Sequence, residues 1–171
     1  MTTTTTTTEK PPTHPSLIRI NHSPIPLCSG AFSLTSLPAG SLLCKITHPT
    51  PSKKAYTSVQ TGRDSHIELN SDLVFCNHSC DPTVEFDMEK MEVRVVQGRD
   101  LREGDPLTFF YPSTEWEMDQ PFECTCGAQG GKCQGWITGA KGLGRDVLGG
   151  YWVNGHIWEL VGEREGEKGR L

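Results

Sequence analysis

Asn77-His78-Ser79-Cys80-Asp81-Pro82-Thr83 is the stretch of sequence that decides the fold of this chain. Taken alone it is typical of a polar turn, because Asn, Ser and Asp side chains hydrogen-bond nearby backbone and Pro presets a bend. About thirty residues later comes Leu107-Thr108-Phe109-Phe110-Tyr111, followed by three cysteines, Cys124, Cys126 and Cys133. The order of these three pieces carries more information than any one of them.

Together, the three pieces resemble the signature of the SET-domain proteins, a family of S-adenosylmethionine-dependent protein lysine methyltransferases. That signature is roughly N-H-S-C-x-P-N, then L-T-F-D-Y, then a post-SET segment with the pattern C-x-C...C. The resemblance covers about residues 16–143. It implies a SET-domain fold, mainly β with short helices, in which small β-sheets surround a pseudoknot and zinc stabilises the post-SET segment.

A chain of 171 residues fits one domain with one buried core. Residues 1–15 are rich in Thr and Pro and hold nothing apolar to bury, which predicts a disordered tail. We expect a SET domain over 16–116, a post-SET zinc segment over 117–140 and a C-terminal helical extension over 141–171.

Short apolar runs separated by Gly, Pro, Ser and Asn predict small strands. The expected strands are 17–20, 31–34, 41–46, 55–60, 67–69, 84–87, 92–96 and 107–110. The hairpin of 84–87 with 92–96 is the clearest, because apolar and polar residues alternate in both arms. Helical spacing over 146–163 predicts a helix or two helical pieces, since Gly149-Gly150 disfavours one straight helix.

The cysteines argue for metal rather than disulfides. Their number, seven, is odd, and no apolar segment of a signal peptide follows Met1, so we expect a reducing compartment, the cytoplasm or the nucleus. Cys124, Cys126 and Cys133 supply three thiolates, one fewer than tetrahedral zinc requires. The resemblance names Cys80 as the fourth ligand, while free cysteines in a flexible loop are the alternative.

The remaining cysteines, Cys28, Cys44 and Cys76, lie in or beside apolar runs. We therefore expect them to be small buried hydrophobic residues. The glycine-rich stretch 127–135 cannot be ordered by side-chain packing, and a bound metal would order it.

Transfer of a methyl group from a sulfonium to an amine requires alignment of donor and acceptor more than a strong base. A free lysine amine is almost wholly protonated at neutral pH, so an apolar channel must favour its neutral form. The resemblance assigns to Tyr111 the catalytic role of orienting the reacting groups beside the cofactor, S-adenosylmethionine.

The resemblance also implies that Asn77 and His78 hold this cofactor, through backbone and side-chain groups. A second contact in the family comes from an N-terminal G-x-G, which here corresponds to Cys28-Ser29-Gly30, followed by Ala31 and Phe32. Only the second glycine is present. Gly30, Ala31 and Phe32 are therefore further candidate cofactor-binding residues, and an ordinary turn between strands is the alternative.

Several signature positions differ. Val74 replaces a frequent arginine, Thr83 replaces the last asparagine, and Phe110 replaces the aspartate before the tyrosine. Six residues rather than four separate Cys126 from Cys133. The insert that helps form the peptide groove is almost absent, which predicts an open acceptor side.

The net charge of -5, with lysine and arginine scattered, argues against a nucleic-acid partner. No run approaches the roughly eighteen apolar residues of a membrane span, so we expect a soluble protein. The leading hypothesis is a methyltransferase acting on an amine, a protein or peptide lysine. The alternatives are an enzyme acting on a small metabolite and a binding module without catalysis, since a fold does not fix a function.

Overall fold

The computed structural model describes residues 11–168. Residues 1–10 of the predicted tail and residues 169–171 of the predicted extension lie outside this range. The backbone N–H groups of Thr13 and His14 both donate to the carboxylate of Asp72, each at 2.8 Å. The chain is therefore attached to the domain slightly before Ser16, where the sequence predicted the domain to begin.

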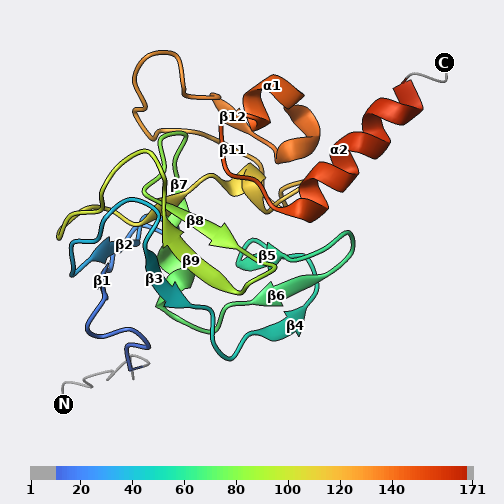
Figure 1. Ribbon diagram of the computed structural model, residues 1–171. Coiled ribbons are helices and arrows are strands. Elements are labelled where there is room, and N and C mark those ends of the chain that lie inside the picture. The colour runs from blue at the N-terminus through green and yellow to red at the C-terminus, as the bar shows by residue number, and fades with distance from the viewer. Residues whose placement is uncertain (1–10, 169–171) are drawn as a thin grey trace.

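Short strands form five small sheets in the described part of the chain (Figure 1). Strands β1 (Ile18–Asn21) and β2 (Gly30–Ser33) pair antiparallel, as do β11 (Phe122–Glu123) and β12 (Trp136–Ile137). Two antiparallel three-stranded sheets have the orders β3-β9-β8 (Leu42–Lys45, Glu92–Val95, Val84–Asp87) and β4-β6-β5 (Thr50–Ser52, His66–Glu68, Ser58–Gln60). The fifth sheet is the parallel pair of β7 (Asn77–His78) and β10 (Thr108–Phe109).

Short helices complete the fold. They are the 3-10 helices η1 (Asp72–Phe75), η2 (Tyr111–Ser113) and η3 (Ala140–Gly142) and the α-helices α1 (Arg145–Leu148) and α2 (Gly155–Lys168). The predicted fold class, mainly β with short helices, is confirmed. None of the described helices is both long and apolar enough to span a membrane.

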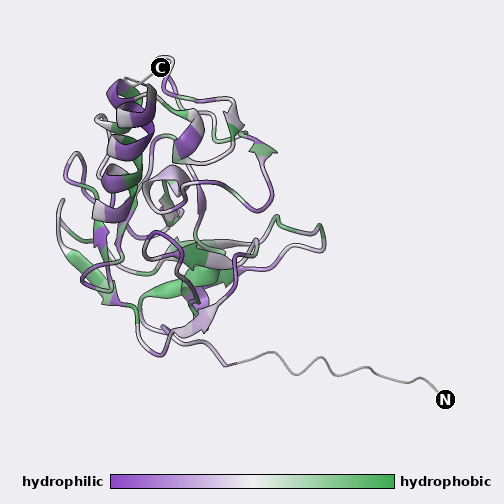
Figure 2. Ribbon diagram, turned by 90° about the vertical axis from the view of Figure 1, so that its right-hand side faces the viewer, coloured by the Kyte–Doolittle hydropathy of each residue, from purple (hydrophilic) through white to green (hydrophobic). Residues whose placement is uncertain are grey.

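The main core lies around the β8–β9 hairpin, where Phe86 faces Val93 across the two strands. Both side chains are fully buried. Because alternate residues of a strand point to opposite faces, Glu85 and Arg94 lie on the other side of the hairpin. Figure 2 shows hydrophobic residues gathered on the central strands. The hairpin predicted from its alternation therefore forms the centre of the molecule.

The parallel pair of β7 and β10 places the two sequence motifs side by side. Thr108 pairs with Asn77 and Phe109 with His78. The contact continues beyond the strands, because the N–H of Ser79 donates to the carbonyl of Phe109 at 3.0 Å. Strand β10 lies within the strand predicted over 107–110. Strand β7 was not predicted, because two residues are too few to show an alternating pattern.

A second hydrophobic cluster joins the cysteine segment to the C-terminal helices, which lie together at the top of Figure 1. Its buried members include Cys80, Phe110, Ile137, Leu148 and Ile157. The polar surface of α2 faces outward along much of its length (Figure 2). The C-terminal extension is thus packed against the cysteine segment.

Two helical pieces replace a single helix in the C-terminal region, as the sequence allowed. The break falls at Gly149-Gly150, and α2 then begins at Gly155. Strands β4, β11 and β12 escaped prediction because each has only two or three residues.

Candidate active site

Tyr111 is separated from β10 by one residue, Phe110, and begins η2. Its hydroxyl donates to the backbone carbonyl of Cys76 at 3.2 Å, and its ring lies 4.7 Å from that of Phe109 and 6.0 Å from that of Phe122. Burial, aided by the nearby Cys76 and Glu115, raises the pKa of Tyr111 above its usual value. The hydroxyl is therefore protonated at neutral pH, so it acts as a hydrogen-bond donor and not as a base.

Asn77 joins the first motif to the stretch around Gly30. Its side-chain Nδ2 donates to the carbonyl of Ser29 at 2.8 Å. A Cβ atom added to Gly30 would lie 3.3 Å from the same Nδ2 and 3.5 Å from the ring of Phe32. The structure therefore brings Gly30 and Asn77 together, two residues that the sequence predicted for one cofactor site.

Ala31 and Phe32 occupy different surroundings. Ala31 is buried in the main core, and its carbonyl accepts the N–H of Leu107 at 2.8 Å. The Phe32 ring is half-buried beneath the guanidinium of Arg19, at 5.4 Å from the ring centre. Ala31 thus contributes packing, while Phe32 borders the Gly30 turn.

The imidazole of His78 has a partner on each ring nitrogen. The N–H of Tyr111 donates to Nδ1 at 3.2 Å, and Nε2 lies 3.2 Å from Sγ of Cys80. Burial lowers the pKa of His78 to about 4, so the ring is neutral at pH 7. His78 therefore contacts both the catalytic candidate and the cysteine cluster.

The four predicted metal ligands come together although Cys80 is far from the others in sequence. The sulfur atoms of Cys80, Cys124, Cys126 and Cys133 all lie within 4.8 Å of one another, and those of Cys80 and Cys124 are 3.9 Å apart. Zinc–sulfur bonds of about 2.3 Å in a tetrahedron place sulfurs about 3.8 Å apart. The cluster is compatible with zinc in ligand type, number and spacing.

The protonation of these thiols also suits a metal. Burial raises the pKa of Cys80 to about 11. Burial would raise that of Cys126 too, but hydrogen bonds with the backbone of Cys80 and Ala128 outweigh it, and the pKa falls to about 7. Without a cation, Cys126 would ionise near neutral pH and Cys80 would stay protonated, whereas a bound zinc ion deprotonates its cysteine ligands.

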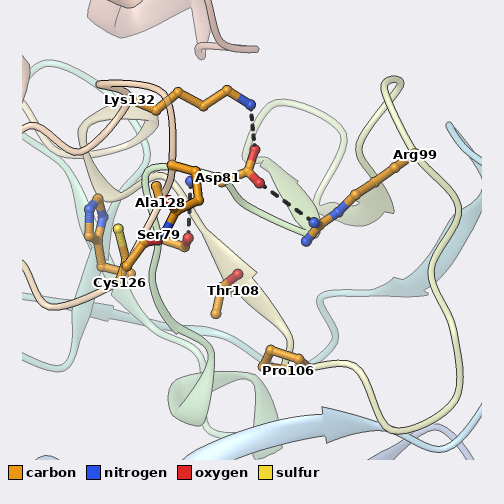
Figure 3. Close-up of a pocket in the computed structure, with 11 residues that line it drawn as sticks. Ser79, Asp81, Arg99, Pro106, Thr108, Cys126, Ala128 and Lys132 are labelled. Atoms are coloured by element: carbon orange, nitrogen blue, oxygen red, sulfur yellow. Dashed lines mark hydrogen bonds and ion pairs between the residues drawn. The ribbon is translucent and has the colours of Figure 1, made fainter.

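A cavity of about 350 Å³ lies beside the cysteine cluster, between the first motif and the glycine-rich loop. Its lining includes His78, Thr108 and Cys126. Figure 3 shows Asp81 at its rim, between Lys132 at 2.9 Å and Arg99 at 3.7 Å. The pair with Lys132 attaches the glycine-rich loop to the first motif, and the pair with Arg99 attaches the turn after β9 to it.

The extra length of that loop is accommodated by Gly130 and Gly131. Both have positive φ angles, 68° and 75°, and a Cβ atom on either would meet nothing within 4 Å. Because glycine adopts this conformation without strain, the loop turns outward and leaves Cys126 and Cys133 in contact with their partners.

Three features of the site escaped the sequence analysis. Phe122 lies against both Tyr111 and His78, with ring centres 6.0 and 5.7 Å away. The Cys76 carbonyl accepts a hydrogen bond from the Tyr111 hydroxyl, which the sequence could not indicate because every residue has a backbone carbonyl. Glu115, four residues after Tyr111, is buried, and burial raises its pKa to about 7. Only Phe122 had a possible signal, its place two residues before Cys124.

The prediction for the other cysteines was partly wrong. Cys44 and Cys76 are buried as expected, and burial raises the pKa of Cys44 to about 11. Cys28 is exposed. It lies between β1 and β2 in a stretch with Pro24 and Pro26, where the apolar residues Ile25 and Leu27 are also exposed, so the apolar pattern there marks a loop and not a core strand.

The small sheets, the paired motifs and the four-cysteine cluster together define a SET-type methyltransferase. A family model for the SET domain matches residues 29–112, and the chain belongs to the SET-domain methyltransferases. Methyltransferase flvH of Aspergillus flavus is 51% identical over 157 residues, covering 91% of this chain and 87% of the relative. A histone-lysine N-methyltransferase of Aspergillus oryzae, specific for lysine 36 of histone H3, is 36% identical over 69 residues, which are 38% of this chain and 7% of that protein.

These relationships establish methyl transfer as the activity of this chain. The alternative of a binding module without catalysis is set aside.

Proposed function

We propose that this methyltransferase transfers a methyl group from S-adenosylmethionine to an amine, the side chain of a protein lysine. One observation carries the proposal: the Tyr111 hydroxyl donates to the backbone carbonyl of Cys76, the residue before Asn77. A hydroxyl group and a carbonyl oxygen therefore lie together where the two motifs meet. A neutral amine can donate to such a carbonyl, and an oxygen lone pair of the tyrosine can receive a polarised C–H group.

S-adenosylmethionine supplies an electrophilic methyl group on a sulfonium. In the transfer, the lone pair of the amine forms the new C–N bond while the C–S bond breaks and its electrons return to sulfur. The protein must therefore present an unprotonated amine in line with the methyl group. Phe109 and Phe122 give the surroundings of Tyr111 an apolar character, which disfavours the ammonium form.

The residues we assign to the cofactor are Gly30, Ala31, Phe32, Asn77, His78 and Tyr111. The contact between Asn77 and the Ser29–Gly30 turn supports this assignment, because it joins the two stretches that must share the ligand. We assign zinc to Cys80, Cys124, Cys126 and Cys133, which would hold the post-SET segment beside Tyr111. Thiolate ligands persist in the cytoplasm or nucleus, where thiols stay reduced.

A small-molecule amine is the second candidate acceptor. The part of the chain between β3 and β7 contains only the sheet β4-β6-β5 and η1. Strand β4 is exposed along most of its length, so this part provides little wall for a peptide groove. An acceptor held without a long groove suits a metabolite as well as a lysine.

The test uses S-adenosylmethionine labelled in its methyl group, added with the purified enzyme to a cell lysate. Label in protein supports the lysine acceptor, and label in the small-molecule fraction supports the metabolite. The Tyr111→Phe variant keeps the ring and its packing but removes the hydroxyl. We expect its transfer rate to fall on the order of 100-fold or more, with cofactor binding retained in calorimetry. Full activity in this variant would refute the role given to Tyr111.

A further inference from the structure

His78 lies where the two predicted sites meet. It belongs to β7, two residues before Cys80, and its neighbour in the parallel sheet is Phe109, two residues before Tyr111. Its two ring nitrogens face in different directions, Nδ1 toward the Tyr111 backbone and Nε2 toward Cys80 Sγ. A single side chain thus touches a metal ligand and the catalytic segment.

The hydrogen bond at Nδ1 fixes the position of the ring proton. A backbone N–H can only donate, so Nδ1, which accepts from Tyr111, carries no proton. In a neutral imidazole the proton must then lie on Nε2. Because Nε2 is 3.2 Å from Cys80 Sγ, His78 donates to this sulfur.

Cys80 Sγ is a hydrogen-bond acceptor for a second group as well. The backbone N–H of Gln134, next to Cys133, lies 3.4 Å from the same sulfur. Burial of Cys80 disfavours its thiolate, and two donors on the sulfur act in the opposite direction, toward the thiolate form that binds zinc. They also restrict the directions in which the sulfur can point.

The aromatic surroundings hold the imidazole in place. The rings of Phe110, Tyr111 and Phe122 lie 5.7, 5.3 and 5.7 Å from the His78 ring. Phe122 is two residues before Cys124, so the strand that leads to the metal ligands packs directly on the ring. A hydrogen bond partly shielded from water in this way is stronger than an exposed one.

We propose that His78 is a positioning residue that couples the zinc site to the catalytic tyrosine. Its Nε2–H donates to the Cys80 thiolate, and its Nδ1 holds the backbone of Tyr111 in register. The inference rests on the proposed zinc site and adds that the metal and Tyr111 communicate through one imidazole ring. Loss of the metal would then make the position of Tyr111 less fixed, and a change at His78 would lower the affinity for zinc.

Two variants separate the two ends of the ring. In His78→Gln the side-chain amide reaches the place of Nε2 and can still donate to Cys80. In His78→Asn the shorter amide reaches the place of Nδ1 and can still accept from Tyr111. Removing such a partner of a metal ligand typically costs 10–100-fold in metal affinity. We expect about that loss of zinc affinity in His78→Asn. In His78→Gln, which keeps a donor to Cys80, we expect a loss of less than about 3-fold, below that range.

Zinc affinity is measured by competition with a coloured chelator on the full-length, zinc-loaded protein. Thermal unfolding of the same samples shows whether each variant is folded. Equal losses in both variants, or no loss in either, would overturn the coupling. Because the readout is metal affinity, this result stands whether or not a methyl acceptor has been found.

A measurement on the unmutated protein covers the case in which a variant does not fold. Nitrogen-15 NMR of the zinc-loaded protein distinguishes a proton on Nε2 from one on Nδ1. We expect the Nε2–H form of His78. An Nδ1–H form with zinc bound would overturn this inference alone, whereas a wild-type protein that binds no zinc would overturn both the inference and the zinc part of the proposed function.

Discussion

Gly30 has no side chain, and this allows the turn at 29–30 to contact the first motif at Asn77. The Asn77 amide lies against its backbone and donates to Ser29, so the turn and the first motif are in direct contact. A Cβ atom at this position would lie 3.3 Å from the amide nitrogen. Asn77 would have to move, and its hydrogen bond to Ser29 would lengthen.

We therefore expect Gly30→Ala to weaken S-adenosylmethionine binding by about tenfold or more, equivalent to about 1.4 kcal/mol. Overpacking of this kind costs about 1–3 kcal/mol. Calorimetric titration measures the affinity. Gly98→Ala is the matched control, because a Cβ atom there meets nothing within 4 Å. Unchanged affinity in Gly30→Ala would remove Gly30 from the cofactor site.

At the level of single residues, the sequence was informative where chemistry needs a particular side chain. Cys124 could be predicted to join a cysteine cluster because few side chains can replace a thiol as a metal ligand, and the family resemblance named Cys80. The role of Tyr111, also named by the resemblance, stays a prediction. Phe122 and Glu115 could not be predicted, because an aromatic ring or a carboxylate fits many positions. Thr83, which replaces the last asparagine of the signature, is buried. Its hydroxyl donates to the Pro106 carbonyl at 2.8 Å, so a hydrogen bond still joins the end of the first motif to the residue before Leu107.

Among the secondary-structure elements, the C-terminal extension explains another departure. The Phe110 ring stacks on that of Tyr151, with centres 3.7 Å apart, and the Tyr151 hydroxyl donates to the Cys80 carbonyl at 2.8 Å. An aspartate in place of Phe110 would leave a charge against this ring. The residue before Tyr111 thus packs against the segment before α2, a pairing that only tertiary structure reveals.

Glu115 ties β5 to the segment after Tyr111. Its carboxylate accepts the N–H of Gln60 at 2.8 Å, and the Gln60 side-chain carbonyl accepts the N–H of Trp116 at 2.8 Å. The next carbonyl back in the chain, that of Thr114, contacts His156 of α2 at 2.9 Å. These hydrogen bonds together link β5, the segment after Tyr111 and α2. They also hold the Glu115 carboxyl group away from water.

The burial of Glu115 predicts a pH dependence of stability. Its pKa is about 7 in the folded protein against 4.5 for the ordinary group. Between these values the folded state holds a proton that the unfolded state has lost, so the free energy of unfolding falls as pH rises from about 4.5 through about 7. The full effect is roughly 3 kcal/mol. In Glu115→Gln this contribution is absent.

Urea unfolding of wild type and Glu115→Gln at pH 5 and pH 8 tests this prediction. Relative to wild type, the variant should gain roughly 3 kcal/mol between the two pH values. Taking the difference between the proteins at each pH removes contributions that both share, including that of zinc. Glu117→Gln, two residues away and exposed, should show no such gain. The same difference at both pH values would mean that Glu115 ionises normally.

At the scale of the whole molecule, two hydrophobic clusters stabilise different parts of the chain. The main core contains the β3-β9-β8 sheet and follows from ordinary apolar patterning. The second cluster contains the cysteine segment and the C-terminal helices, and its parts have little regular structure. The sequence predicted the strands of the first cluster from their patterning, and of the second it predicted the cysteines and the helical pieces. It did not predict how α1 and α2 pack onto Phe110 and Ile137, because that packing depends on contacts between distant residues.

Because the second cluster is built around the four sulfurs, its order should depend on zinc more than that of the main core. Removing the metal with a chelator should lower the free energy of unfolding by at least about 3 kcal/mol, the contribution of a ligand present at a few hundred times its dissociation constant. Hydrogen exchange should accelerate in residues 117–140 while amides of β8 and β9 stay protected.

Cys126→Ser should reproduce both effects and purify with almost no zinc, whereas Cys28→Ser, which changes an exposed cysteine, should retain about one zinc ion per chain. Uniform exchange throughout the chain after chelation would show that the two clusters unfold as one, and equal zinc content in the two variants would show that the four-cysteine cluster is not the metal site.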